Sequence, residues 1–142
     1  MQERFSRNIR VYYEDTDAGG IVYYANYLKF FERVRSDWLR SLGLLDVDLR
    51  RQDNAMFVVH QATLSCHRPA RLEDELSVDV VVASSRRASL VFHQQAHRAT
   101  LRGRDLIAEA DISIAYLDCT SMRPKALPPQ LLQVLNFSPP TK

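Results

Sequence analysis

The length of 142 residues favours one domain, residues 1–142, that is large enough to bury a hydrophobic core. A hydrophobic fraction of 46% with 25% charged residues is typical of a globular protein, and a formal charge of +2 is too small to suggest nucleic-acid binding. The N-terminal residues lack the apolar core of a signal peptide, and no apolar run approaches the roughly 18 residues of a membrane span. Two cysteines do not make a disulfide framework, so we expect a cytoplasmic protein with reduced thiols.

The first third of the chain predicts a strand, a turn and a long helix. Residues 7–13 are rich in β-branched and aromatic side chains, which favours a strand, and the DTDAGG segment that follows favours a turn. From about residue 24 to residue 42, apolar side chains recur with the period of an α-helix, and Gly43 supplies a C-terminal stop. The stripe consists of Tyr27, Phe31, Val34, Trp38 and Leu42.

The rest of the chain changes to a period of two. Four alternating segments follow, around residues 57–66, 76–82, 90–96 and 106–116, with a short helix expected both in residues 44–55 and in the proline-broken tail. A strand, one long helix and four sequential strands predict an α+β fold with an antiparallel β-sheet wrapped around the helix. Such a sheet leaves a face and two edges uncovered, so we expect a homo-oligomer.

Several familiar kinds of catalytic site are missing. The sequence contains no nucleophile elbow, no P-loop and no dinucleotide-binding glycine motif. A metal site that used His93 and His97 is disfavoured, because residues four apart on a strand lie about 13 Å from one another. Cys119 has no neighbour in the sequence that would activate it as a nucleophile.

The acids ahead of the long helix have two readings. Asp15 and Asp17 can cap the helix or form a turn, which is the common role of acids at this position. One acid satisfies that need, however, and Gly19 and Gly20 would let the backbone approach a ligand closely. A carboxylate on one side of a carbonyl and the unpaired amides of a helix start on the other could hydrolyse a thioester without a metal.

A second candidate feature lies between two predicted strands. Arg86, Arg87 and Ser89 can form a solvated turn, or they can hold the phosphate groups of a carrier.

These stretches resemble a known family over most of the chain. The segment YYEDTDAGGIVYYANYLKFFERVR resembles the signature of the 4-hydroxybenzoyl-CoA thioesterase-like branch of the hotdog fold. It is most similar to the tol-pal system-associated acyl-CoA thioesterase subgroup, and RPARLEDEL, SSRRASLVF and RPKALP continue the similarity in the family's order. The resemblance implies a hotdog fold, dimers or tetramers, and hydrolysis of acyl-CoA with no metal and no cofactor.

The resemblance also implies roles for individual residues. The catalytic carboxylate falls on Asp17, as nucleophile or general base, and the amide that polarises the thioester falls on Tyr24. Arg86, Arg87 and Ser89 match a stretch that contacts CoA, and Phe57 to Val59 match a strand that lines the acyl pocket. The chain departs from the subgroup at Tyr24, where histidine is common; an amide role survives this change and an imidazole role does not.

Two rival functions remain open at this point. One is a hotdog protein that binds acyl-CoA or acyl carrier protein without hydrolysing it. The other is a dehydratase, which would need a histidine near the catalytic acid, and residues 1–59 contain none.

Overall fold

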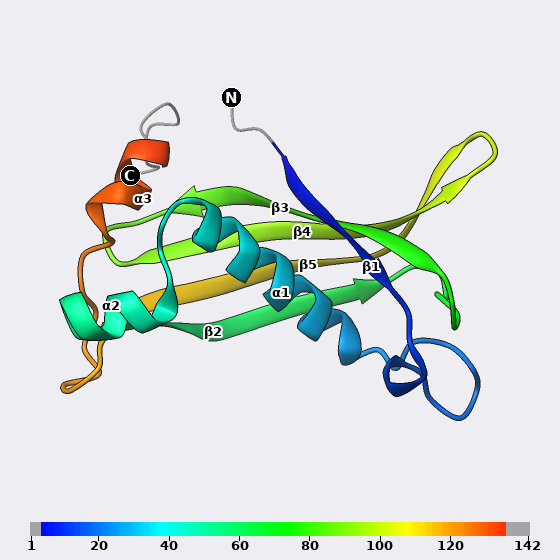
Figure 1. Cartoon of the computed structure of the whole chain (residues 1–142), viewed down its shortest axis with the longest axis horizontal. Coiled ribbons are helices and arrows are strands. Elements are labelled where there is room, and N and C mark those ends of the chain that lie inside the picture. The colour runs from blue at the N-terminus through cyan, green and yellow to red at the C-terminus, as the bar shows by residue number, and fades with distance from the viewer. Residues whose placement is uncertain (1–3, 136–142) are drawn as a thin grey trace.

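The computed structural model describes residues 4–135 and contains a single antiparallel sheet with one long helix against it. In chain order the elements are β1 (Phe5–Arg10), a 3-10 turn (Tyr13–Asp15), α1 (Asn26–Ser41), α2 (Asp46–Asp53), β2 (Ala55–Cys66), β3 (Glu75–Ser85), β4 (Ser89–Thr100), β5 (Gly103–Asp118) and α3 (Pro129–Leu135). Figure 1 shows α1 lying across one face of the sheet. The predicted α+β hotdog architecture is confirmed, while Asn136 and Phe137 of the predicted tail lie outside the described residues.

Helix α1 forms where the apolar stripe predicted it. Tyr27, Phe31, Val34 and Trp38 are all buried against the sheet. The helix ends as expected, because Gly43 adopts a left-handed conformation (φ 81°) that glycine reaches without strain, and its amide donates to the carbonyl of Arg40.

Strand β1 covers residues 5–10 and not the predicted 7–13. Its ladder with β3 stops at Arg10, and the Val11 amide then donates to the carbonyl of Asp74. The chain turns because the Asp15 carboxylate accepts the Tyr12 amide at 2.9 Å. The hydrogen bond from the Tyr12 amide to the Asp15 side chain competes with further pairing of β1 with β3, so the strand ends early.

The strand order is β1-β3-β4-β5-β2, so the sheet is not a simple meander. Strand β2 pairs only with β5 and forms one edge, and β1 pairs with β3 at the other edge. Edge strand β1 carries Arg7 and Arg10, whereas the twelve residues of β2 include no Asp, Glu, Lys or Arg.

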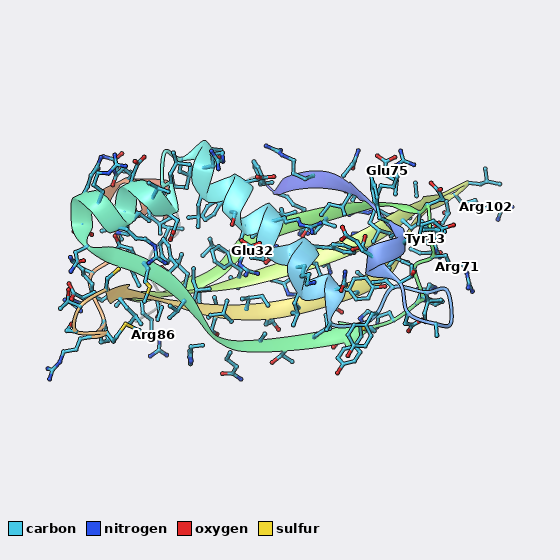
Figure 2. The ribbon with its side chains drawn as sticks, turned by 60° about the horizontal axis from the view of Figure 1, so that its bottom comes forward. Tyr13, Glu32, Arg71, Glu75, Arg86 and Arg102 are labelled. Carbon is cyan, nitrogen blue, oxygen red and sulfur yellow. The ribbon has the colours of Figure 1, made fainter. Side chains whose placement is uncertain are left out.

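The two ends of this sheet carry different candidate residues. The Asp17 hairpin lies beside the start of β3, since Arg10 is paired with Glu75 and Val22 donates to the carbonyl of Ala70. The eleven residues of β3 span about 33 Å. Arg86 follows the far end of β3, and Figure 2 shows it at the opposite end of the molecule from Tyr13.

Within residues 4–135, no helix is both long and apolar enough to cross a membrane.

Candidate functional site

Asp15 has a structural role, because its carboxylate accepts hydrogen bonds from within the chain. Its side chain is buried at 3% exposure, and one oxygen accepts the Tyr12 amide while the other accepts the Asn26 side chain at 2.8 Å. Its carbonyl accepts the Tyr23 amide. Asp15 thereby ties the 3-10 turn to the first residue of α1, and both of its carboxylate oxygens are occupied.

Asp17 lies on the same hairpin but is exposed. Its Oδ1 accepts the Gly19 amide at 2.8 Å, its amide donates to the Ile21 carbonyl, and its second oxygen has no partner in the described chain. Gly20 has a φ of 80°, which explains a glycine there, and a Cβ on Gly19 would lie 3.2 Å from Asp17 Oδ1. The two glycines therefore fit the turn that presents this carboxylate.

Tyr24 lies at the start of α1, where amides lack partners. Its amide and that of Ala25 find no acceptor within residues 4–135, and the N-cap Ala25 has no side chain that could supply one. These N–H groups and the helix dipole make this end of α1 attractive to a developing negative charge. The antiparallel bridge between Thr16 and Val22 closes a short hairpin, with Asp17 next to Thr16 on the side of its tip and Tyr24 two residues beyond Val22.

Arg86, Arg87 and Ser89 are not brought together with Asp17 in one chain. The Arg86 amide donates to the Ser89 carbonyl, which closes the turn between β3 and β4. Both arginines are exposed and form no ion pair with a described residue, while Ser89 is half-buried. Within one chain the arginines therefore lie at the end of β3 away from Asp17.

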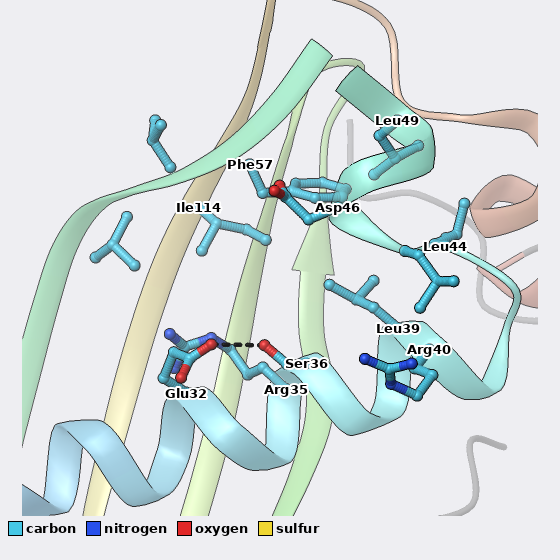
Figure 3. Close-up of a pocket in the computed structure, with 13 residues that line it drawn as sticks. Glu32, Arg35, Ser36, Leu39, Arg40, Leu44, Asp46, Leu49, Phe57 and Ile114 are labelled. Carbon is cyan, nitrogen blue, oxygen red and sulfur yellow. Dashed lines mark hydrogen bonds between the residues drawn. The ribbon is translucent and has the colours of Figure 1, made fainter. Parts of the chain in front are cut away.

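Phe57 and Val59 line a cavity of about 400 Å³ between α1, α2 and β2. Figure 3 shows its apolar walls, with Leu39 on α1, Leu49 on α2 and Ile114 on β5. A second hollow of about 340 Å³ continues along α1 toward Leu28. The Phe57 ring also contacts the Tyr116 ring, with centroids 4.7 Å apart.

Arg35 lines both hollows, and the sequence analysis did not identify it as a site residue. It is 7% exposed, and burial lowers the pKa of its guanidinium while the charge of Glu32 opposes that shift. A signal for it was present, because Arg35 follows Phe31 by four residues and precedes Trp38 by three, which places a cation within the buried stripe.

Two histidines, His67 and His93, form hydrogen bonds with carboxylates. His67 lies 2.7 Å from Glu109, and this hydrogen bond lowers the pKa of Glu109. His93 lies 2.9 Å from Asp111. Among residues 4–135, no group of three or more His, Cys, Asp or Glu side chains is arranged to hold a metal ion.

Comparison with known proteins gives consistent matches across the chain. It is 39% identical over 131 residues to "Acyl-CoA thioesterase YbgC" of Haemophilus influenzae, which covers 92% of this chain and 93% of the relative. It is 40% identical over 124 residues to "Acyl-CoA thioester hydrolase YbgC" of Escherichia coli O157:H7, which covers 87% and 90%. Because YbgC is the tol-pal-associated protein, the predicted subgroup is confirmed.

Solved structures agree on the fold. The 4-hydroxybenzoyl CoA thioesterase of Pseudomonas sp. strain CBS-3 superposes with a TM-score of 0.83 at 20% sequence identity, over 92% of this chain and 98% of that one. Residues 11–135 match the Thioesterase-like superfamily. The chain belongs to this superfamily, as the match over residues 11–135 and the two relatives near 40% identity show.

Proposed function

We propose that this chain is an acyl-CoA thioesterase in which Asp17 and the Tyr24 amide carry out the hydrolysis. The activity is supported by two relatives at 39–40% identity that cover about nine tenths of the chain and are named for it. The assignment to these residues rests on one observation: an exposed carboxylate with a free oxygen lies on the hairpin that leads to the unpaired amides of α1.

The proposed reaction begins with the thioester carbonyl oxygen accepting the Tyr24 N–H. That hydrogen bond and the helix dipole stabilise the negative charge that develops on this oxygen. Asp17 then acts in one of two ways. As a base it removes a proton from water, the hydroxide adds to the carbonyl, and CoA leaves as the thiolate and takes up the proton. As a nucleophile it displaces the CoA thiolate to form an anhydride, which water then hydrolyses.

Two copies of the chain would complete the CoA site. Arg86 and Arg87 have free guanidinium groups suited to phosphate, but they lie at the end of the sheet away from Asp17. Strand β2 runs between these two ends. Near its start, Phe57 pairs with Tyr116, and the Tyr116 amide donates to the carbonyl of Ala88 in the turn of the two arginines. Beyond its other end the chain reaches Ala70, whose carbonyl accepts the Val22 amide of the Asp17 hairpin. Antiparallel pairing of β2 with β2 of a second copy would therefore bring the arginines of one copy toward Asp17 of the other.

The edge of β2 suits such a pairing. It is twelve residues long, it has no permanently charged side chain, and Val59 near its centre is 52% exposed. A long uncharged edge of this kind tends to pair with another strand, whereas β1 at the other edge is short and carries two arginines.

Substitution of the proposed catalytic carboxylate tests the chemistry. Asp17→Asn should lower kcat for thiol release from acyl-CoA by about 100-fold or more, since general base catalysis contributes that much. Thiol release is followed with a colour reagent over short-chain, long-chain and aromatic acyl-CoAs, and the fold is checked by circular dichroism. A folded Asp17→Asn protein with wild-type turnover would exclude this mechanism. Binding of acyl-CoA without any thiol release by the unmodified protein would favour the non-hydrolytic alternative.

Mixing two impaired variants, assayed at a substrate concentration below the KM of the arginine variant, tests whether the site is shared. Asp17→Asn and the double variant Arg86→Ala/Arg87→Ala are each expected to be impaired, the second through a higher KM for CoA esters. After joint unfolding and refolding, half of the dimers are hybrids with one intact site, so roughly a quarter of the wild-type activity should return. No recovery would show that each chain uses its own arginines or none.

Use of acyl carrier protein in place of CoA and the cytoplasmic location stay predictions.

A further inference from the structure

The guanidinium of Arg35 is a buried cation that no carboxylate neutralises. It is 7% exposed, and the single hydrogen bond that its side chain makes to a described residue runs from Nη1 to Gln94 Oε1 at 3.0 Å. Within residues 4–135 Arg35 forms no ion pair, because the nearby Glu32 is exposed and accepts the Ser36 hydroxyl. Burying a charge without an opposite charge is costly, so this arrangement needs a reason.

Gln94 cannot supply the missing charge. Its amide nitrogen donates to the carbonyls of Phe31 and Asp79, at 3.0 and 3.1 Å, which leaves its oxygen to face Arg35 as a neutral acceptor. Arg35 therefore has further N–H donors without acceptors. Among the described residues, His97 Nδ1 is the only side-chain nitrogen or oxygen that is both inaccessible to solvent and without a hydrogen-bond partner. The unbonded nitrogens of Arg35 thus keep accessible surface, and the hollows that this residue lines provide it.

Arg35 lies on the same helix as the proposed thioester site, but farther along it. The two hollows share Glu32, Arg35 and Val59, so together they follow α1 from Leu28 to Leu39. Nine residues separate Arg35 from Asn26 at the start of α1, which corresponds to about 14 Å along the helix axis. A thioester carbonyl held at Tyr24 is too far away to contact Arg35. An acyl group that extended from that carbonyl along α1, past Leu28 and into the hollows, would be directed toward Arg35.

We propose that Arg35 binds a carboxylate at the far end of the acyl group, so that the preferred substrates are CoA thioesters of dicarboxylic acids. This inference rests on the proposed function, because the helix start must hold the thioester. The planar fork of a guanidinium matches a carboxylate, and the apolar walls suit the methylene chain between the two ends. Other charged side chains line the hollows with both signs, and all of them are exposed, so Arg35 is the buried charge among the lining residues: Lys29, Glu32, Arg40 and Asp46.

The test compares acyl groups that differ only at their far end. Thioether analogues of CoA, which cannot be hydrolysed, are prepared in matched pairs of equal length that end in a methyl or a carboxylate, and their Kd values are measured by calorimetry. At the chain length that reaches Arg35, the wild-type protein should bind the carboxylate form about 10- to 100-fold more tightly, as expected for charge-assisted hydrogen bonds. Arg35→Met should abolish this preference, and Arg35→Lys should keep part of it.

Arg40→Met is the matched control, since it removes an exposed arginine from the same cavity and should leave the preference intact. Equal binding of the two forms by the wild-type protein would overturn the proposal. An Arg35→Met variant that weakens both forms equally would also overturn it and assign Arg35 to holding Gln94. A carboxylate preference that depends on Arg35, without thiol release from the corresponding thioesters, would support the pocket and refute the proposed hydrolysis.

Discussion

At the scale of single residues, the two acids before α1 differ in a way that the sequence did not decide. Both fit the pattern of a cap, and only the resemblance favoured Asp17 for catalysis. In the structure Asp15 is buried with both oxygens bonded, while Asp17 is exposed with one oxygen free. Burial of a short side chain depends on distant partners such as Asn26, which is why local spacing could not distinguish them.

Asp15→Asn should therefore act on stability. An amide can accept through one oxygen only, so the Tyr12 amide or the Asn26 side chain loses its partner. We expect the free energy of unfolding to fall by about 1–3 kcal/mol, measured by urea denaturation. An unchanged urea midpoint together with a collapse of turnover would mean that the roles of the two acids are reversed.

The adjacent glycines provide a second pair of contrasting changes. Gly20→Ala places a side chain at a φ of 80°, and the strain should cost about 1–2 kcal/mol of stability although no atom lies within 4 Å of the new Cβ. Gly19→Ala keeps ordinary backbone angles but brings its Cβ to 3.2 Å from Asp17 Oδ1. It should lower kcat more than stability. Thermal unfolding and thiol release on both variants check this, and equal effects of the two on kcat would contradict it.

At the scale of elements, the period of the apolar side chains was sufficient to predict an element that buries one continuous apolar face. Helix α1 and its Gly43 stop follow directly from the order of side chains. The end of β1 did not follow, because the hydrogen bond from the Tyr12 amide to Asp15 ends the strand earlier than its aromatic content suggests. The stripe indicates that Arg35 is buried but not what its guanidinium contacts, because its hydrogen-bond partner Gln94 lies 59 residues away on β4.

The link between α1 and β4 should behave as a unit. Gln94→Leu removes the only acceptor that Arg35 has among the described residues and should cost about 1–3 kcal/mol, because a buried charged donor loses its hydrogen bond. Arg35→Met in the same chain should recover part of that loss, because no buried charge then remains. Urea denaturation of the two single variants and the double variant measures the coupling. Additive losses would show that the two side chains stabilise the fold independently.

At the scale of the whole molecule, the sequence predicted the kinds of element but not their order in the sheet. The alternating patterns of β2 and β3 fit a meander equally well, yet β2 lies at the far edge beside β5. That pairing joins segments about fifty residues apart, and no local pattern encodes it. Arg86 and Asp17 lie at opposite ends of this sheet, a separation that the order of residues along the chain does not show.

The uncharged edge of β2 gives the last prediction. Thr63→Lys together with Ser65→Lys places charge on this exposed edge, which is how proteins commonly prevent edge-to-edge pairing. We expect a monomer in analytical ultracentrifugation and a loss of thioesterase activity, because each Asp17 would lack the arginines of a second copy. Ser6→Lys with Asn8→Lys adds the same charge to the other edge, β1, and should change neither property. If the β1 variant dissociates while the β2 variant stays dimeric and active, the copies associate through the opposite edge, and the shared site proposed above is wrong.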